Sequence, residues 1–222
     1  MTRRPRGRKS TEKPRNPLLK ERILKVAELQ FADRGYKGTS TRDIAAAAKV
    51  NQALINYYFG SKSRLYHAIF NGRGKELSRS RAVLLDELEQ QSKPPSLEAL
   101  IRSFLVPAIS MKHQGPHAMA FLRLQARLQS EPKEITGKLR KAVYNETTIR
   151  YIKAFQRALP HIESSVIYWR MTMMIGAYLY LVSDVNRLEH LSNGQCDVQD
   201  EREVLKQLVA FLVGGFESQL AN

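Results

Sequence analysis

The side chains best suited to recognition chemistry lie within residues 52–59. Gln52 and Asn56 are four residues apart, so a helix would place both amides on one face. Ala53 and Tyr57 flank that face. Amide side chains pair with the N6 and N7 edge of adenine, and a small alanine leaves room for a thymine methyl group. This face therefore predicts base contacts in a DNA major groove.

Thr41 and Arg42 are the next candidates, because they stand at the predicted start of a short helix. Ser40 and Asp43 form a capping pattern just before the alanine-rich run 44–48. A hydroxyl, a guanidinium and the free backbone N–H groups of a helix start can all meet one phosphate. We expect Thr41 and Arg42 to fix the register of the protein on a DNA backbone.

Apolar periodicity predicts the helices that would hold these side chains. Within residues 18–34, Ile23, Ala27 and Phe31 recur at helical spacing. Gly35 follows, where a left-handed cap would end the helix. This first helix and the two short helices that follow it would form a compact basic trio. The last of the three would turn its apolar side to the core of the trio.

Helical periodicity continues beyond the trio, and the sequence predicts no strand. Ser61 or Ser63 opens a longer helix towards Gln91. The later predicted helices, separated by proline or glycine breaks, are 96–112, 116–130, 132–159, 162–191 and 200–220. The predicted fold class is all-α, with about nine helices. A three-helix helix-turn-helix domain would span 18–62, and a C-terminal helical bundle 63–222.

Basic residues are concentrated in the first third of the 222-residue chain. Residues 1–74 hold 17 Lys and Arg against 5 Asp and Glu, a net charge of +12, whereas residues 75–222 hold 19 against 16, a net +3. A domain with this charge attracts phosphate backbones. The single cysteine cannot form a disulfide framework and favours a reducing compartment. We expect a cytoplasmic protein with no membrane partner.

Residues 1–17 carry seven Lys and Arg and almost no apolar side chain, which predicts a flexible arm. Arg4, Arg6 and Arg8 with Gly7 resemble an AT-hook, although Lys9 stands where that element usually ends in proline. The glycine would let the backbone sink into a narrow minor groove while the arginines seek its negative potential. The alternative is an unspecific tail that attracts phosphates.

Four stretches of the trio together resemble the TetR family of transcriptional regulators. They are FADRGY (31–36), TSTRDIA (39–45), VN (50–51) and INYYFGSK (55–62). The resemblance implies a helix-turn-helix whose second helix enters the major groove of an operator. It also implies a two-fold dimer, which would set its recognition helices about 34–36 Å apart on DNA.

The resemblance adds further DNA contacts to the base-reading and phosphate-binding candidates: Asn51, Tyr57, Tyr58 and Lys62. Tyr58 could instead be a core aromatic residue with its hydroxyl at the rim, and Gln52 and Asn56 could be solvated surface. Two positions depart from the family pattern. Lys49 stands where the turn commonly has glycine, so either a lysine adopts a left-handed conformation or the turn differs. Asn56 replaces a frequent tyrosine.

Apolar and small side chains of the last two long helices predict a dimer interface. Two such helices from each subunit would make an isologous four-helix contact. The alternative is that this stripe packs on the core of its own subunit. The predicted interface residues are Ala177, Tyr180, Leu181, Val204, Leu208, Phe211, Leu212, Gly215 and Phe216.

Methionine and aromatic side chains of the middle helices predict a pocket for a small apolar effector, although each could equally be plain core. They are Met111, Phe121, Leu124, Tyr151, Phe155, Trp169, Met173, Met174 and Tyr178. The layout of 96–220 is similar to the fatty-acid-responsive subgroup of TetR regulators. This similarity implies a fatty acid or an acyl thioester, with Arg123, Arg127 or Arg170 as carboxylate partner. The three arginines could equally be surface or intersubunit charges.

Motifs for catalysis and cofactors are missing from the sequence. His113 and His117 have the spacing of helical metal ligands, but Gly115-Pro116 between them breaks the helix. Cys196 lies in a polar stretch without a partner motif, and Gly72–Lys75 lacks the spacing of a phosphate-binding loop. We expect no cofactor, no metal and no enzyme activity.

These features together predict a sequence-specific transcriptional regulator, most simply a repressor that releases a palindromic operator when an effector binds its C-terminal domain. One alternative is an architectural protein that binds A·T-rich DNA without an effector. A strong specificity ratio for few sites would separate the regulator from the architectural protein. A second alternative, a ligand-binding or enzymatic helical protein, is disfavoured by the basic N-terminal third.

Overall fold

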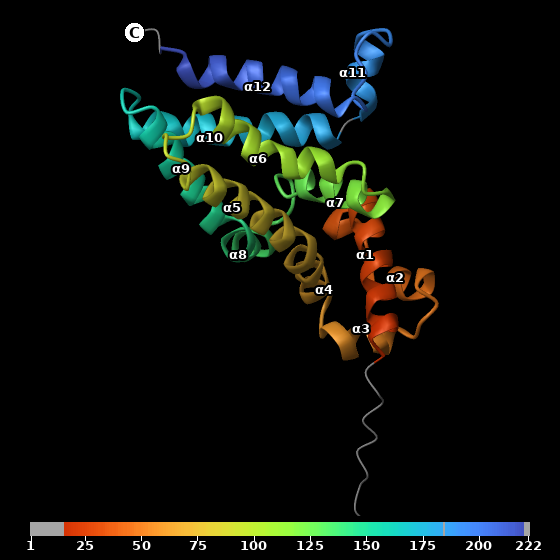
Figure 1. The fold of residues 1–222 in the computed structure, drawn as a ribbon. Coiled ribbons are helices and arrows are strands. Elements are labelled where there is room, and N and C mark those ends of the chain that lie inside the picture. Colours follow the sequence, from red (N-terminus) through yellow and green to blue (C-terminus); the bar gives the residue numbers. More distant parts are fainter. Residues whose placement is uncertain (1–15, 184, 220–222) are drawn as a thin grey trace, which may run out of the picture.

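The computed structural model describes residues 16–183 and 185–219, and these ranges contain helices and turns but no strand. The predicted all-α class is confirmed. A small N-terminal trio of helices, red to orange in Figure 1, lies at one end of a larger helical bundle. The predicted arm lies outside the described residues, except for Asn16 and Pro17 at the start of the first helix.

The trio consists of α1 (Pro17–Gly38), α2 (Thr41–Ala47) and α3 (Gln52–Phe59). α1 starts where the Asn16 side chain accepts hydrogen bonds from free backbone N–H groups of the first turn. The helix is interrupted at Gly35, where φ is 70°, so the break predicted at this glycine is confirmed. Ile23, Ala27 and Phe31 are fully buried, as their spacing predicted.

Side-chain caps begin α2 and α3, and one residue with a left-handed backbone conformation lies in the turn between these two helices. Ser40 Oγ accepts a hydrogen bond from the Asp43 N–H at 3.1 Å, so the predicted cap of α2 is confirmed. Asn51 caps α3 in the same way, through the Ala53 N–H at 2.8 Å. Lys49 has φ 52°, which is the left-handed alternative left open by the sequence. A non-glycine residue in this conformation costs about 1 kcal/mol.

The long helix predicted after the trio is interrupted by a π-helical turn. Its parts are α4 (Lys62–Ile69), the π turn (Phe70–Gly74) and α5 (Lys75–Glu89). Ser61 caps α4 through the Arg64 N–H. A Cβ atom on Gly74 would lie 2.8 Å from Val143 Cγ1 and 2.9 Å from Tyr144 Oη. Glycine is therefore required for the close approach of the turn to these two residues.

The remaining helices form the bundle: α6 (Leu97–Met111), α7 (Pro116–Arg127), α8 (Lys133–Val143), α9 (Asn145–Ala158), α10 (Ser164–Ser183), α11 (Val185–Leu191) and α12 (Glu201–Glu217). The segments predicted at 132–159 and 162–191 are each split into two helices. With the π turn, these splits give α1 to α12 in the described residues where the sequence predicted about nine helices.

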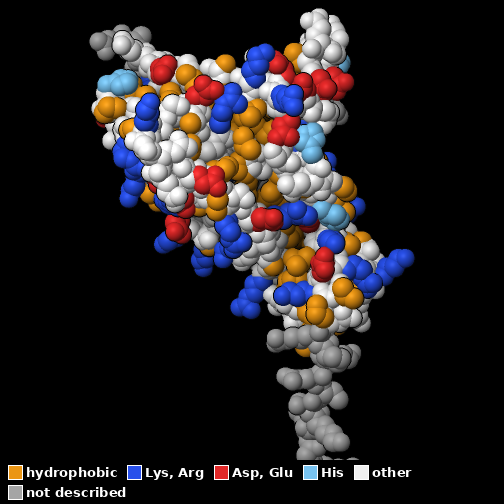
Figure 2. All heavy atoms as spheres, in the orientation of Figure 1, with side chains coloured by type: hydrophobic (Ala, Val, Ile, Leu, Met, Phe, Trp, Pro, Cys, Tyr) orange, Lys and Arg blue, Asp and Glu red, His pale blue; other side chains and the backbone are white. Residues whose placement is uncertain are grey.

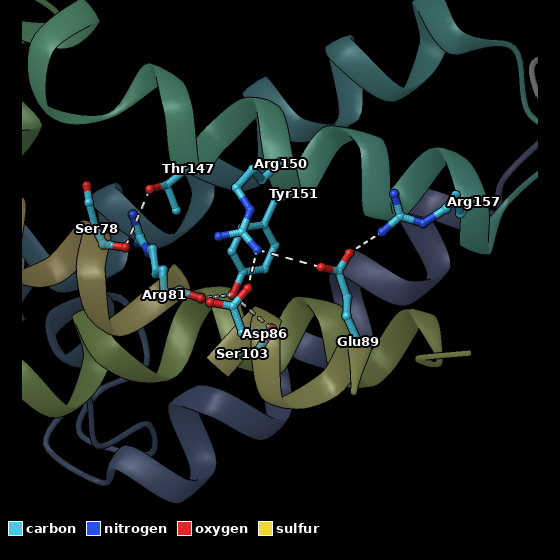
Figure 3. Close-up of polar contacts among 9 residues, drawn as sticks. All are labelled: Ser78, Arg81, Asp86, Glu89, Ser103, Thr147, Arg150, Tyr151 and Arg157. Carbon is cyan, nitrogen blue, oxygen red and sulfur yellow. Dashed lines mark hydrogen bonds and ion pairs between the residues drawn. The ribbon is translucent and has the colours of Figure 1, made fainter. Parts of the chain in front are cut away.

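Polar side chains hold α5, α6 and α9 together (Figure 3). Two ion pairs join α5 to α9: Asp86 with Arg150, and Glu89 with Arg157. Between the helices, the buried Tyr151 hydroxyl donates to the Arg81 carbonyl at 2.9 Å and lies 3.1 Å from Ser103 Oγ. The aromatic rings of this region are thus fixed by hydrogen bonds as well as by packing.

The trio packs on the bundle through α1 and α7 (Figure 1). Arg127 Nε donates to the Ala32 carbonyl at 2.7 Å, and its Nη2 to the Asp33 carbonyl at 2.9 Å. These carbonyls belong to the last regular turn of α1 before its break, where a cation also suits the helix dipole. Glu131 accepts from the Tyr36 N–H at 2.7 Å. We call this set of contacts the interdomain joint.

A buried carboxylate completes the interdomain joint. Glu28 of α1 is 4% exposed and lies 2.7 Å from Arg73 of the π turn and 3.2 Å from His117 of α7. Burial raises the pKa of Glu28, while the charges of Arg73 and His117 act in the opposite direction. One side chain of α1 therefore links the trio to both the π turn and α7.

Candidate nucleic-acid interface

The outer face of α3 carries the predicted base-reading side chains. Gln52, Ala53 and Asn56 are exposed, whereas Ile55 and Phe59 are buried in the core of the trio. The helical period thus separates a polar outer face from an apolar inner face, as predicted. Contact of this face with bases stays a prediction.

The start of α2 lies against the start of α3. Gln52 Nε2 donates a hydrogen bond to Thr41 Oγ1 at 2.9 Å. This bond orients the Gln52 amide and joins a predicted phosphate ligand to a predicted base reader. Arg42 follows Thr41 in the first turn of α2 and is exposed. Its guanidinium is available at a helix start, where anions are favoured.

Tyr58 and Asn51 already serve local structure. The Tyr58 ring is half-buried, and its hydroxyl accepts a hydrogen bond from the Asn16 N–H at 3.1 Å and lies 3.4 Å from the Asn16 carbonyl. This placement favours the rim alternative for Tyr58, because a phosphate would compete with Asn16. Asn51 is exposed, but its side chain caps α3. Asn16 was not predicted as a cap from the sequence, although its position directly before Pro17 is typical of one.

Tyr57 and Lys62 are the remaining DNA contacts implied by the family resemblance. Tyr57 is half-exposed and its ring makes an edge contact with the Tyr58 ring, with centroids 5.2 Å apart. Lys62 Nζ lies 4.4 Å from the centroid of the Tyr36 ring, a cation–π contact. Burial lowers the pKa of Lys62. A phosphate contact by Lys62 stays a prediction.

The surface of the trio is basic as well as polar. Figure 2 shows Lys and Arg side chains projecting on both sides of the trio, at the end of the molecule far from α12. Such charges supply the salt-dependent part of DNA affinity. Arg4, Arg6 and Arg8, the predicted minor-groove contacts, lie outside the described residues.

The bundle contains a cavity of about 640 Å³. Its wall is formed by α5 to α10 with the α7–α8 turn, and includes Arg81, Phe104, Gln125, Tyr144 and Tyr178. Volumes of this size are typical of small-molecule sites. The cavity is therefore the candidate effector site.

The predicted effector residues need correction, because Tyr178 alone among them lines the cavity. Trp169 and Met173 are 68% and 64% exposed, since they face outward on α10. The others are buried core residues that fill space between helices: Met111, Phe121, Leu124, Tyr151, Phe155 and Met174. Phe121, for example, packs on Phe70 of the π turn with centroids 5.4 Å apart. Buried apolar residues and pocket residues have the same sequence pattern, so periodicity could not separate them.

The three arginines proposed as carboxylate partners also have other roles. Arg127 belongs to the interdomain joint, and Arg123 lies 3.3 Å from Asp33 of α1. Arg170 is buried and donates to the backbone carbonyls of Phe216 and Ser218 at the end of α12. None of the three lines the cavity.

The cavity arginine was missed by the sequence analysis. Arg81 stands in a charged stretch, which suggests a solvated helix face, yet it is 3% exposed. A signal was present, because Leu77, Arg81 and Leu85 are spaced by four and share the buried face of α5. An arginine in register with buried leucines is a candidate for a buried charge.

The predicted dimer residues divide into two groups. Leu208, Leu212 and Phe216 are buried within their own subunit, which is the alternative left open by the sequence. Phe216, for example, packs on Phe155 with centroids 4.7 Å apart. The predicted residues that remain half-buried or exposed are Ala177, Tyr180, Leu181, Val204, Phe211 and Gly215.

The histidines and the cysteine lie apart from one another within the described ranges. Residues 16–183 and 185–219 contain no cluster of three metal-ligating side chains and no helix long and apolar enough to span a bilayer. His117 is bound to Glu28, whereas His113 lies 3.6 Å from Glu201. Cys196 is exposed.

Known proteins resemble both parts of the chain. Residues 23–69 match the model of bacterial regulatory proteins of the tetR family, and residues 102–215 match that of the Tetracyclin repressor-like, C-terminal domain. The HTH-type transcriptional repressor Rv3405c of Mycobacterium tuberculosis is 46% identical over 57 residues, 26% of this chain and 30% of that protein. The repressor NicS of Pseudomonas putida is 30% identical over 116 residues, 48% of this chain and 55% of that protein.

These two matches span less than two thirds of each relative's length. Similarity of fold covers more of the chain than these sequence matches do. A TetR-family regulator of Bordetella parapertussis has a TM-score of 0.67 at 15% identity, over 93% of this chain and all of that one. The C-terminal model alone covers just over half of the chain. The chain therefore belongs to the TetR family of transcriptional regulators.

Proposed function

We propose that this protein is a ligand-responsive repressor that binds a palindromic DNA operator as a homodimer. The exposed polar face of α3, set beside the start of α2 by the bond between Gln52 and Thr41, carries the proposal. A recognition helix of this kind reads base edges while the adjoining helix start binds phosphate. The relatives Rv3405c and NicS, both described as transcriptional repressors, support the sign of regulation.

An exposed apolar surface on α10 and α12 supports the dimer. Trp169, Met173 and Tyr180 are exposed at spacings of four and seven, and so share one side of α10. α12 lies next to α10 and exposes Phe211, with 72% of its surface accessible (Figure 1). Large exposed apolar groups on neighbouring helices are typical of protein interfaces. We assign the dimer contact to this surface, which replaces the buried part of the predicted interface.

The cavity and the interdomain joint support the response to a ligand. Glu28 and the backbone of α1 are tied to α7 and to the π turn by short polar contacts. α7 and α8 also contribute to the cavity wall, through Gln125 and Arg140. A ligand that prefers one arrangement of these helices would shift the position of the trio. A coupling free energy of about 1–3 kcal/mol suffices to change operator affinity by about 5- to 150-fold.

Selection of genomic fragments by the purified protein at physiological salt tests DNA recognition. We expect one palindromic motif, bound by two copies of the chain. Asn56→Ala should weaken binding to that motif by about 1–3 kcal/mol and relax the base preference at one position in each half-site. Asn71→Ala is the matched control, because Asn71 is exposed on the π turn away from α3.

The selection also distinguishes the repressor from an architectural protein. Broad recovery of A·T-rich fragments without a motif would contradict the proposal and favour the architectural alternative. Unchanged affinity and base preference in Asn56→Ala would contradict the assignment of α3 as the reading helix. Release of the motif by a small molecule, measured in the same assay, is the expected sign of the ligand response.

A further inference from the structure

Arg81 brings a buried positive charge to the wall of the cavity. Its Nε donates to the Phe104 carbonyl at 2.8 Å, and its guanidinium carbon lies 3.7 Å from the Phe104 ring centroid and 5.2 Å from that of Tyr178. Within the described residues it has no ion-pair partner, and its Nη2 makes no hydrogen bond. A buried cation without a counter-charge is unfavourable, and an anionic ligand would offset this cost.

The rest of the cavity wall reinforces the positive charge. Arg140 is the other charged residue among the described lining residues, and no Asp or Glu lines the cavity. Its Nη2 donates to the Leu128 carbonyl at 2.6 Å and lies 3.3 Å from Gln129 Oε1. Arg140 is held through Nη2 and Arg81 through Nε, so each guanidinium has further N–H donors, and Arg81 is the more deeply buried of the two. A carboxylate matches the planar guanidinium best.

Two further polar atoms of the wall, Gln125 Oε1 and Tyr144 Oη, are buried without a hydrogen bond of ordinary length, and the Gln125 amide lies close enough to the Tyr144 hydroxyl to lower its pKa. Gln125 is 5% exposed and Tyr144 is half-buried. Burial raises the pKa of Tyr144, so its hydroxyl stays protonated and can donate or accept. Unpaired buried polar groups are costly, and a ligand with its own donor would pair with the amide oxygen.

Aromatic surface completes the cavity. Phe104 and Tyr178 flank Arg81, and Tyr144 and Tyr180 also contribute to the wall. Such rings favour offset or edge contacts with a flat aromatic body. Building on the proposed effector response, we infer that this cavity binds a small aromatic carboxylate bearing a hydroxyl or ring N–H donor. Its carboxylate binds Arg81 and its donor lies near Gln125.

This ligand class differs from the acyl chain implied by the sequence. The carboxylate of a fatty acid could reach Arg81, but its methylene chain offers no donor or acceptor to Gln125 Oε1 and Tyr144 Oη. Sites built around hydrogen bonds discriminate strongly against ligands that lack the matching group. The cavity should therefore prefer the hydroxylated aromatic acid to an aliphatic acid of equal charge.

Thermal-shift and calorimetric titrations of the full chain test this inference. The probes are 4-hydroxybenzoate, salicylate and indole-3-acetate, each compared with its carboxamide, and decanoate and palmitate as aliphatic acids. We expect at least one aromatic acid to raise the melting temperature, with its carboxamide and the aliphatic acids inactive. Arg81→Met should weaken that binding by about 10- to 100-fold. Tyr144→Phe, which removes one hydroxyl from the wall and leaves the charge of Arg81 in place, should weaken it less.

Controls separate a loss of binding from a loss of folding. Arg79→Met makes the same chemical change on an exposed position of α5 and should leave binding unchanged. Arg81→Met removes the buried charge together with its hydrogen bond to the Phe104 carbonyl, and a cooperative thermal unfolding transition without ligand, which we expect, shows that the variant folds. Equal binding of acid and carboxamide, full binding by Arg81→Met, preference for the aliphatic acids, or no binding of any aromatic acid would overturn the inference.

The DNA selection and the ligand titrations can fail separately, so the repressor proposal and the ligand class are tested independently. If an operator motif is found and aliphatic acids release it, the proposed repressor stands and the ligand class is wrong. If no motif is found but an aromatic acid binds through Arg81, the ligand class stands and the repressor proposal fails.

Discussion

Gly74→Ala tests whether the π turn is in tight contact with the cavity wall. Gly74 has helical dihedral angles, φ −66° and ψ −39°, so the backbone itself tolerates alanine. In an open helix this substitution would stabilise the protein by about 0.5–1 kcal/mol, because alanine loses less backbone entropy. Here the added Cβ would lie 2.8 Å from Val143 Cγ1 and 2.9 Å from Tyr144 Oη.

The steric cost should exceed the gain in helix propensity. Relief of the 2.8 Å contact to an ordinary separation of about 3.4 Å requires a shift of about 0.6 Å. Val143 and Tyr144 come from the junction of α8 and α9, so the shift involves backbone as well as side chains. Overpacking of this kind costs about 1–3 kcal/mol. We expect a net loss of about 1 kcal/mol in the free energy of unfolding.

Urea denaturation monitored by circular dichroism measures this loss, and Gly72→Ala is the matched control. A Cβ on Gly72 meets no atom within 4 Å, so this variant should gain about 0.5–1 kcal/mol from helix propensity alone. The double variant Gly74→Ala with Val143→Ala should show a favourable coupling free energy of about 0.5–1 kcal/mol. Stabilisation of Gly74→Ala to the same extent as Gly72→Ala would refute the close contact.

Three further perturbations address the turn, the dimer and the interdomain joint. Lys49→Gly should stabilise the protein by about 0.5–1 kcal/mol in thermal unfolding, because φ is 52° at this position and glycine adopts that conformation without strain. Lys49→Ala should not stabilise it. Equal effects of the two substitutions would contradict the argument that Lys49 is strained. Phe211→Glu should convert the proposed dimer to a monomer, measured by sedimentation velocity. The control Val83→Glu, at an exposed site on α5, should leave the dimer intact. If the Phe211→Glu variant is still a dimer, α12 is not part of the interface. Burial raises the pKa of Glu28 in the folded state, so its contribution to stability is complete below about pH 4.5 and is lost as the pH rises through that raised pKa. Over this rise in pH, the free energy of unfolding of the wild type should fall relative to that of Glu28→Gln. If the difference in the free energy of unfolding between the two proteins stays constant with pH, the pKa of Glu28 is not raised.

The trio could be predicted from the sequence because its determinants are local. Caps at Ser40 and Asn51, the break at Gly35 and the buried face of α3 all depend on residues within a few positions of each other. The π turn could not be predicted in this way. Nothing near Gly74 in sequence reveals Val143 and Tyr144, about 70 positions away, which lie within 3 Å of a Cβ placed there.

The bundle was harder to interpret because periodicity reports burial without naming what covers a residue. Trp169 and Phe216 are both aromatic residues on helices, yet one is exposed and the other packs in the core. Arg81 shows the opposite difficulty, because its charge suggested solvent although its register with Leu77 and Leu85 indicated burial. Side-chain type and helical register disagree at this position, and a disagreement of this kind marks a residue as a candidate for a binding site.

Tyr144 connects the cavity with the trio. Its side chain lines the cavity, and its hydroxyl lies 2.9 Å from the position of a Cβ atom built on Gly74, in the π turn that follows α4. We expect a ligand that binds this hydroxyl to shift the ring, because the hydroxyl is buried and packed close to Gly74. Because packed interiors deform little, part of that displacement should reach the π turn, where Arg73 holds Glu28 of α1. Tyr144→Phe should therefore reduce operator release at saturating ligand by more than its effect on ligand affinity explains, and an unchanged extent of release would exclude Tyr144 from the coupling.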